Sequence, residues 1–407
     1  MKISMVLGLS LVILWGGASR GMANLEGLDD DALNHVLART SDADLLPLRL
    51  VSKRVGAAAT AEIIRRGSHT FSMKTMKAAD LPHLVNFLKA RKAARTLTIS
   101  DFQAGLFCQA LMALRAEEHD FSFRSLRSLV VKNGDIPVED LNRLLALLDM
   151  MPNLTSLNLG YNNIDATGAR AIAGSPHLAR LTSLTLERND IGAAGAQAIA
   201  ASANMTHLTH LDLRGNNIRD AGAQAIAESP HLLHLTSLDL QLNNIGAAGA
   251  RAIAGSPHLA GLTSLNLGAN NITAAGAQAI AESPHLVTLT SLALRFNKID
   301  ATGARAIAGS PHLAPLTSLN LGYNRIGAAG AQAIVGSPHL VHLTYLNLEG
   351  NNLEAAGAEA IAASANMKHL TSLNLLGNAI GDAGEQAIIR SPHLVHLGPS
   401  RQRLVWG

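Results

Sequence analysis

The segment LTHLDLRGNNIRDAGAQAIA, residues 208–227, decides the fold, because nearly the same residues return throughout the second half of the chain. The asparagine at Asn216 and the glycine at Gly222 recur at a fixed interval of 27 residues, and so does the first leucine. A fixed period of this length is typical of a solenoid, in which each unit packs only on its neighbours. The equivalents of the first leucine are Leu154, Leu181, Leu208, Leu235, Leu262, Leu289, Leu316, Leu343 and Leu370.

The pattern L-x-x-L-x-L-x-x-N-x-I/L within this unit resembles the leucine-rich repeat. The resemblance implies an α/β solenoid with parallel strands on the concave face and helices on the convex face. Leu211 and Leu213 alternate with polar residues, so we expect both to point into the core from a short strand. We expect Asn216 to bond backbone groups that the following turn leaves unpaired, and Gly222 to let the chain bend into a helix.

The chain divides into five segments by composition. Residues 1–23 combine Lys2, an apolar run and small residues, which is typical of a secretory signal peptide. The apolar run is too short for a transmembrane helix, so we expect a secreted protein without stable membrane insertion after removal of the leader. If Met22 is the true start, the protein is cytoplasmic. The remaining segments are a helical region (24–66), degenerate repeats or a cap (67–153), nine regular repeats (154–397) and a tail (398–407).

Within the degenerate repeats, residues 71–73 and 97–99 are expected to be strands, and residues 141–150 a helix. Leu126 lies 28 residues before Leu154 and keeps the spacing of the repeat. The basic residues Lys89, Arg91, Lys92 and Arg95 are interpreted as a solvated helix face.

Residues 24–66 predict three short helices, and their most specific run is Leu48-Arg49-Leu50-Val51-Ser52-Lys53-Arg54. This segment resembles an F-box, although Asp29 and Val55 stand where the family has proline and tryptophan. The resemblance implies binding to a Skp-family adaptor of a ubiquitin ligase. The alternative is a helical cap that only seals the first repeat. The matching adaptor-binding residues are Leu28, Leu33, Val36, Leu37, Leu45, Leu46, Leu50, Val51 and Ser52.

The helical sequence Gly-Ala-Gln-Ala-Ile-Ala at 222–227 is similar to the G-A-x-A-L-A of the GALA family, although the 27-residue unit looks more like ribonuclease-inhibitor repeats. GALA proteins are F-box plus leucine-rich-repeat effectors that pathogenic bacteria inject into plant cells. The resemblance implies an effector that acts as a substrate adaptor of a host SCF-type ubiquitin ligase. The alternative is a non-enzymatic binding scaffold with no ubiquitin role.

Enzymatic and metal chemistry find little support in the sequence. A net charge of +3 without a long basic run does not predict a nucleic-acid or membrane-surface partner. The single Cys108 excludes an internal disulfide framework and a thiolate zinc cluster, and we expect it to be a buried thiol. No nucleotide-binding or hydrolase motif is present, so we predict no enzymatic activity and no small-molecule cofactor.

A column of histidines recurs in Ser-Pro-His-Leu at the end of seven units. Stacked imidazoles can bind metal or sense pH, but no acidic partner recurs beside them. We therefore interpret them as surface residues copied with the repeat and predict no metal site. They are His177, His231, His258, His285, His312, His339 and His393.

The informative positions are those where the repeats differ, chiefly the two residues that follow each Leu-x-Leu pair. These positions are expected at the edge of the concave face, which repeat proteins use to bind partners, and several hold the aromatic and arginine residues that anchor interfaces. We expect contacts to a target protein from Tyr161, Glu187, Arg188, His210, Arg214, Gln241, Leu242, Arg295, Phe296, Tyr323, Tyr345 and Glu349.

Overall fold

The computed structural model describes residues 70–73, 76–101 and 103–397, which belong to two compact units. The first unit takes in the chain up to Gly134 and residues 147–154, and the second takes in residues 135–146 and the chain from Thr155. The expected leader, the F-box-like segment and the C-terminal tail lie outside the described residues. Within the described ranges, no helix is long and apolar enough to cross a membrane.

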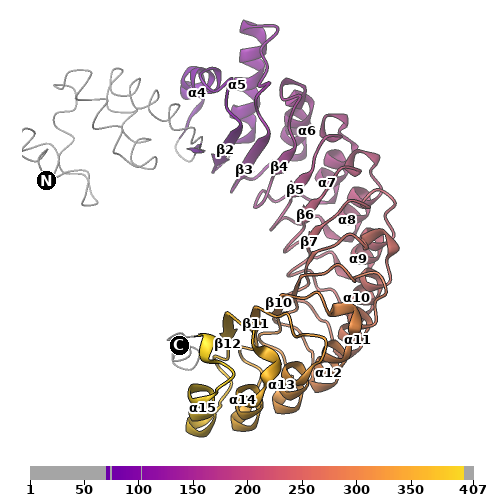
Figure 1. Cartoon of the computed structure of the whole chain (residues 1–407). Helices are drawn as coiled ribbons and strands as arrows, with labels where there is room; N and C mark the ends of the chain where they lie inside the picture. The colour runs from indigo at the N-terminus through magenta and orange to yellow at the C-terminus, as the bar shows by residue number, and fades with distance from the viewer. Residues whose placement is uncertain (1–69, 74–75, 102, 398–407) are drawn as a thin grey trace, which may run out of the picture. The chain divides into compact units, whose positions relative to one another are not determined.

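The first unit alternates strands and helices (Figure 1). Strand β1 (Thr70–Ser72) pairs in parallel with β2 (Thr96–Ser100), and β2 pairs in parallel with β3 (Ser128–Lys132). Helix α4 (Leu81–Lys89) and helix α5 (Ala104–Glu117) follow the first two strands. The short 3-10 helices of this unit are η2 (Ala78–Asp80) and η3 (Leu147–Met150).

The interpretation of Lys89, Arg91, Lys92 and Arg95 as a solvated helix face is wrong for Arg91. This side chain is 1% exposed, because it folds back so that its guanidinium carbon lies 3.5 Å from the centroid of the Phe87 ring. Its Nη1 donates to the Phe87 carbonyl. Lys89 lies at the surface, where it pairs with Glu118 at 2.8 Å. Cys108 is buried in α5, as expected.

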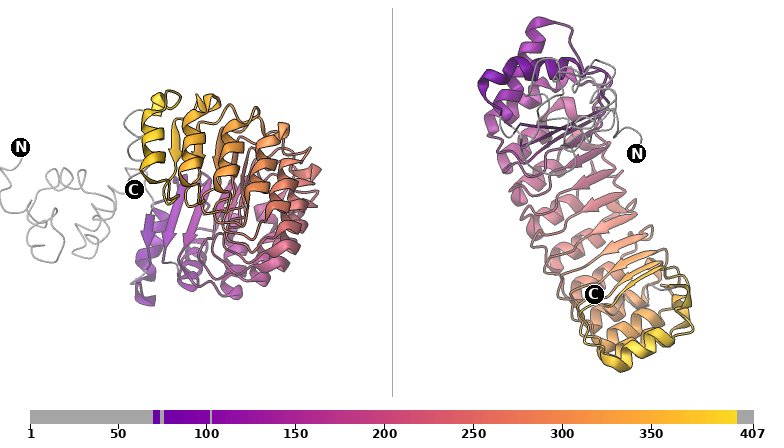
Figure 2. Two further views of the ribbon diagram at one scale, coloured as in Figure 1. Left: turned by 90° about the horizontal axis from the view of Figure 1, so that it is seen from below. Right: turned by 90° about the vertical axis from the view of Figure 1, so that its left-hand side faces the viewer.

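The second unit contains nine three-residue strands that pair in parallel, each with the next in sequence. The register is fixed: Ser183 pairs with His210, and Leu211 pairs with Leu238, exactly one repeat apart. Within this unit the strands line the inner side and the helices cover the outer side (Figures 1 and 2). The strands are β4 (Ser156–Asn158), β5 (Ser183–Thr185), β6 (His210–Asp212), β7 (Ser237–Asp239), β8 (Ser264–Asn266), β9 (Ser291–Ala293), β10 (Ser318–Asn320), β11 (Tyr345–Asn347) and β12 (Ser372–Asn374).

The helices of the second unit carry the expected apolar stripe. In α9, Ala223, Ile226 and Ala227 are buried, and Gln224 is exposed. The helices are α6 (Val138–Ala146), α7 (Ala166–Gly174), α8 (Gly192–Ala200), α9 (Arg219–Ala227), α10 (Ala247–Ala254), α11 (Ala274–Ala281), α12 (Ala301–Gly309), α13 (Gly327–Gly336), α14 (Glu354–Ala363) and α15 (Gly381–Arg390). The 3-10 helices are η4 (Pro176–Leu178), η5 (Ala203–Met205), η6 (Pro257–Leu259), η7 (Pro311–Leu313), η8 (Ala365–Met367) and η9 (Val395–Leu397).

The repeated asparagine joins neighbouring repeats, which confirms its expected role in bonding the turn. The Asn270 Oδ1 accepts from the backbone amides of Asn243 at 3.0 Å and Ile245 at 2.9 Å, both in the preceding repeat. Its Nδ2 donates to the carbonyls of Leu240 at 2.9 Å and Leu267 at 3.0 Å. From Asn189 to Asn378, each asparagine of this series therefore bonds backbone groups of two repeats at once.

Two further hydrogen-bond ladders run along the second unit. Ser256 Oγ donates at 2.5 Å to the carbonyl of Ala227, the last residue of helix α9. This bond satisfies one of the carbonyls that a helix leaves unpaired at its C-terminus. Thr263 Oγ1 donates at 3.0 Å to the carbonyl of Thr236 in the preceding repeat. The repeat units are therefore held together by polar bonds as well as by the leucine core.

The repeated glycine has a different role from the expected bend. Gly222 lies inside α9 rather than before it. A Cβ atom at this position would clash with the Cγ2 of Ile218 at the start of the same helix, and it would lie 3.1 Å from the Cβ of Ala196 in α8. The glycine is needed because both the Ile218 side chain and the neighbouring helix approach its Cα closely.

Candidate protein-binding face

The second residue after each Leu-x-Leu pair has a left-handed backbone in all nine repeats of the second unit. Three repeats place glycine there, which adopts this conformation without steric cost. The others place larger side chains, at a cost of about 1–2 kcal/mol per residue. Retention of a strained, exposed side chain where glycine fits supports a functional role. The nine residues are Tyr161, Arg188, Gly215, Leu242, Ala269, Phe296, Tyr323, Gly350 and Gly377.

The position is held by bonds within the scaffold. The amide of Leu242 donates at 3.0 Å to the carbonyl of Gly268 in the next repeat, and Phe296 donates at 2.8 Å to Gly322 in the same way. The residue before the second leucine caps the same turn: Asp212 Oδ1 accepts from the amide of Arg214 at 3.0 Å. These bonds fix the backbone of the column independently of its side chains.

Two aromatic residues of this column stack on each other. The ring centroids of Phe296 and Tyr323 are 4.3 Å apart with an interplanar angle of 12°, and the side chains are 44% and 40% exposed. The guanidinium carbon of Arg295 lies 4.5 Å from the Phe296 centroid and 4.8 Å from the Tyr323 centroid. The Tyr323 ring packs on Gly350, where a Cβ would lie 2.9 Å from its Cδ1.

Glu349 completes this group, which we call the aromatic cluster (Arg295, Phe296, Tyr323 and Glu349). Its carboxylate accepts from the Tyr323 hydroxyl at 2.6 Å and from Arg295 at 3.2 Å. Asn374 donates to the same carboxylate at 3.2 Å. The hydrogen bond to Glu349 raises the pKa of Tyr323 above its ordinary value, because ionisation of the tyrosine would remove the proton that it donates to the carboxylate. Desolvation of the hydroxyl raises the pKa as well. The cluster is thus preorganised by its own contacts.

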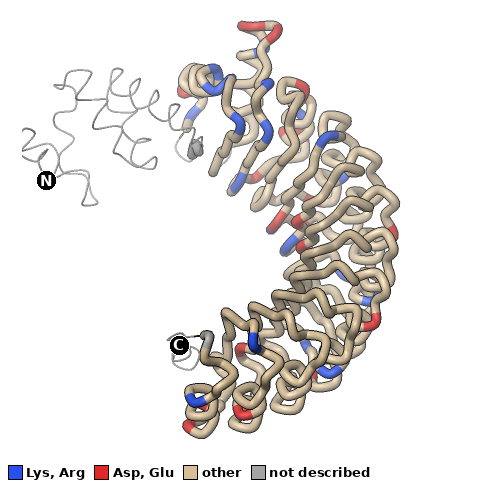
Figure 3. Tube along the Cα trace, viewed as in Figure 1, with Lys and Arg blue, Asp and Glu red and all other residues tan. Residues whose placement is uncertain are grey.

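A second group of charged residues lies at the ends of β5 and β6. Glu187 is 5% exposed and forms an ion pair with Arg214 of the next repeat. Glu187 therefore positions Arg214 instead of presenting its own carboxylate at the surface. Arg188, next to it in the left-handed column, is exposed. Figure 3 shows residues of both charge signs interspersed along the second unit.

The other expected contact residues are spread along the same face. Tyr161 is 42% and Leu242 is 37% exposed, both in the left-handed column. His210 is exposed on β6, with its Nδ1 2.8 Å from the Thr209 hydroxyl. Gln241 accepts from Asn266 at 3.2 Å, and the Tyr345 hydroxyl accepts from Asn347 at 3.5 Å. The structure therefore brings Arg295, Phe296, Tyr323 and Glu349 into one contact group, whereas Tyr161, Glu187, Arg188, His210 and Arg214 lie in the repeats of β4, β5 and β6.

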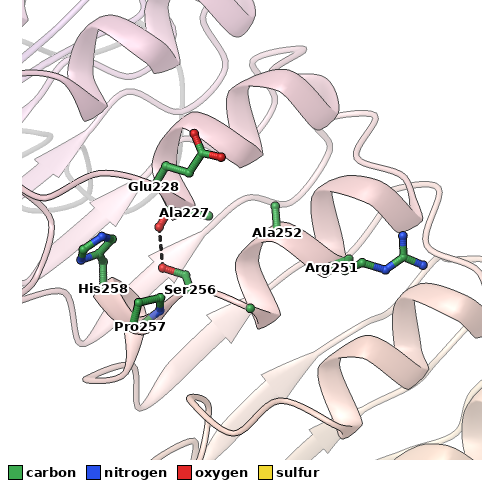
Figure 4. Close-up of a pocket in the computed structure, with 8 residues that line it drawn as sticks. Ala227, Glu228, Arg251, Ala252, Ser256, Pro257 and His258 are labelled. Carbon is green, nitrogen blue, oxygen red and sulfur yellow. Dashed lines mark hydrogen bonds between the residues drawn. The ribbon is translucent and has the colours of Figure 1, made fainter.

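Features on the helix side of the second unit belong to the scaffold. A hollow of about 430 Å³ lies between the C-terminal ends of α9 and α10. Figure 4 shows its lining residues, among them Ser256 and Ala227 with the bond that joins them. Its charged residues, Glu228 and Arg251, are not directed toward one another. No group of three or more His, Cys, Asp or Glu residues in the described part of the chain is placed to hold a metal ion.

The fold and this face define a repeat protein suited to binding other proteins. The repeats are leucine-rich repeats: one family model described as Leucine Rich repeat matches residues 151–173, 177–200, 204–227, 231–254, 260–281 and 366–388. A second, described as Leucine rich repeat, matches residues 287–353. No curated protein matches the chain in sequence.

Three solved structures show similarity to the chain at low sequence identity. An internalin (InlF) from Listeria monocytogenes has 20% identity and a TM-score of 0.41, with 79% of this chain and 92% of that chain covered. A TLR13–ssRNA13 complex has 17% identity and a TM-score of 0.41, with 75% and 43% covered. The yeast Rad7–Elc1 complex has 15% identity and a TM-score of 0.48, with 89% and 85% covered. The fold assignment rests on the repeat pattern and the strand pairing.

Proposed function

We propose that the chain is a secreted, non-enzymatic substrate adaptor of an SCF-type ubiquitin ligase, with a target protein bound on the inner face of the second unit. The observation that carries target binding is the aromatic cluster. Phe296 and Tyr323 keep exposed rings on a left-handed backbone, beside an arginine and a glutamate that are already oriented. Tyrosine and arginine are over-represented among residues that dominate binding energy, and preorganisation lowers the entropy cost of association.

The adaptor half of the proposal rests on the F-box-like residues 24–66, with Leu50 and Val51 at the centre of their most specific run. In this arrangement the chain makes and breaks no bonds. It raises the concentration of the target at the ligase by holding both at once. The effector role carried by the GALA resemblance belongs to the same proposal, and it places the ligase in a host cell.

The adaptor half is tested by capture of a purified Skp-family protein on the immobilised full chain. We expect the intact chain to capture it and Leu50→Asp/Val51→Asp to lose capture. The matched control is Leu233→Asp/Val395→Asp, which places the same charges at residues that are 51% and 58% exposed in the second unit. Capture by none of the three chains would discard the adaptor role and leave the binding scaffold with a helical cap.

The target half is tested by quantitative mass spectrometry of proteins retained from host-cell extract. We expect Phe296→Gly/Tyr323→Gly to lose specific partners that the intact chain retains, because the substitution removes both rings on a backbone that glycine tolerates. The control is Gln224→Ala/Gln278→Ala on the exposed helix faces. An identical set of retained proteins for all three chains would contradict target binding at the aromatic cluster.

A further inference from the structure

Four consecutive members of the left-handed column form an apolar strip, which we define as Leu242, Ala269, Phe296 and Tyr323. Ala269 is half-buried, and the other three side chains are exposed. Backbone bonds connect them repeat by repeat, including 2.6 Å from the Ala269 amide to the Arg295 carbonyl. Adjacent positions are therefore roughly 4.8 Å apart, and the backbones at Leu242 and Phe296 roughly 10 Å apart. Between these two larger side chains, Ala269 carries only a methyl group.

Basic residues accompany the aromatic half of the strip. Lys298 and Arg325 stand two positions after Phe296 and Tyr323 in the same turns, and both are exposed. Their amides donate at 2.8 Å to the carbonyls of Ile272 and Ile299, which fixes the backbone at both positions. The equivalent residues in the other repeats are Asn163, Asp190, Asn217, Asn244, Asn271, Asn352 and Ala379. A basic residue thus occurs at this position only in the two repeats that supply the stacked rings.

The two cations are available to a partner. Among the residues that the structure describes, no carboxylate lies within ion-pair distance of Lys298 or Arg325. Arg295 differs from them, because Glu349 already neutralises it at 3.2 Å. The aromatic end of the strip therefore combines exposed apolar surface with two cations that form no ion pair among the described residues.

We propose that the apolar strip binds an acidic segment of a partner protein. An apolar or aromatic side chain of that segment rests on Ala269 between Leu242 and Phe296, and flanking carboxylates pair with Lys298 and Arg325. The positive charges of Lys298 and Arg325 favour an acidic partner. The small Ala269 side chain between Leu242 and Phe296 leaves room for the anchoring side chain. The inference rests on the target-binding half of the proposed function and adds the chemistry of the partner.

A nucleic acid also offers negative charge and flat rings, but the geometry favours a protein segment. Single-stranded nucleic acids bind through successive bases that stack on open aromatic faces along a basic groove. Here one face of the Tyr323 ring lies against Phe296 and the ring also packs on Gly350. The ring of Tyr323 therefore offers no open face on which a base could stack. Two cations in the turns that hold these rings fit a short acidic segment better than a polyanion.

The experiment is a selection from a random-peptide display library on the immobilised full chain. We expect enriched peptides to share an aromatic or leucine residue flanked by Asp and Glu. A fluorescein-labelled consensus peptide is then measured by fluorescence polarisation. For Lys298→Glu/Arg325→Glu we expect the consensus peptide to bind at least about tenfold more weakly than it binds the intact chain. A peptide with lysines in place of its acidic residues should bind this variant more tightly than the consensus peptide does. The matched control Arg251→Glu/Arg305→Glu reverses two exposed arginines on the helix side and should bind as the intact chain does.

The inference is overturned if no peptide is enriched, if the consensus lacks acidic residues, or if the peptide binds the charge-reversed variant as well as the intact chain. Tighter binding of single-stranded oligonucleotide than of the peptide overturns it in favour of nucleic acid. Failure of this chemistry is distinguishable from failure of the proposed function. If Phe296→Gly/Tyr323→Gly abolishes capture of host proteins while Lys298→Glu/Arg325→Glu leaves it intact, the inner face binds its target and only the acidic partner is discarded.

Discussion

The asparagine ladder gives the sharpest test of how the binding face is held in place. In Asn270→Ala the amides of Asn243 and Ile245 lose their acceptor while they stay buried. A buried amide left without a partner costs about 1–3 kcal/mol, so the two together cost about 4 kcal/mol at a middle value of about 2 kcal/mol each. The Leu240 and Leu267 carbonyls also lose a donor. We expect a total loss of at least about 4 kcal/mol in the free energy of unfolding.

The assay is urea unfolding followed by circular dichroism, combined with hydrogen exchange at the two amides that lose their acceptor. The neighbouring Asn271→Ala is the control, because Asn271 is not fully buried. Its hydrogen bond to the Ile245 carbonyl is donated by its backbone amide, so the substitution leaves that bond in place. It should change stability by less than about 0.5 kcal/mol. Exchange at Asn243 and Ile245 should accelerate by about a thousandfold in Asn270→Ala, since about 1.4 kcal/mol corresponds to tenfold. A loss under about 1 kcal/mol in Asn270→Ala would refute the reasoning that buried amides depend on this side chain.

Three further predictions address the helix packing, the left-handed column and the aromatic cluster. Gly195→Ala should lose about 1–3 kcal/mol in the free energy of unfolding, measured by thermal unfolding, because its Cβ would lie 2.9 Å from the Cβ of Ala169. The control is Gly309→Ala, which has open space around it and should not be destabilised by a clash. Tyr161→Gly should be more stable to urea than Tyr161→Ala by about 1 kcal/mol, the reverse of the usual order, because φ is +60° there; equal stabilities would contradict the strain. Glu349→Gln should lower the pKa of Tyr323, because the carboxylate raises it; the pKa is measured by phenolate absorbance with the other two tyrosines replaced by phenylalanine. The hydrogen bond stabilises the fold below the ordinary tyrosine pKa, and this stabilisation is lost as pH rises through the raised pKa. An unchanged titration midpoint of Tyr323 in the variant would refute the assignment.

The sequence predicted the scaffold because its determinants are local and periodic. Leu211 and Leu213 follow the two-residue period of a strand, and Ala223, Ile226 and Ala227 follow the spacing of one helix face. The close approach of α8 and α9 at Gly222 was missed, because it depends on a neighbour one repeat away. The burial of Arg91 was also missed, since a long side chain can fold onto an adjacent ring as readily as it extends into water.

The sequence predicted which positions form the candidate site, but it did not predict how their side chains contact one another. The variable residues after each Leu-x-Leu pair include all four members of the aromatic cluster, but pairing of Glu187 with Arg214 and stacking of Phe296 on Tyr323 depend on side-chain conformations. The left-handed backbone did leave a signal. Gly215, Gly350 and Gly377 stand in the same column as the aromatic residues, and glycine recurring at one position of a repeat indicates that conformation.

The ladders along the second unit have a consequence for how the chain folds. The side-chain bonds of these ladders connect residues close to one period apart in sequence, as from Thr263 to Thr236 or from Ser256 to Ala227. The mean sequence separation of contacts therefore does not grow as repeats are added, and relative contact order falls with the length of the array. We expect folding to nucleate within a few neighbouring repeats and to propagate from them. Deleting residues 235–261, one complete period, would leave every remaining junction with its asparagine, serine and threonine partners.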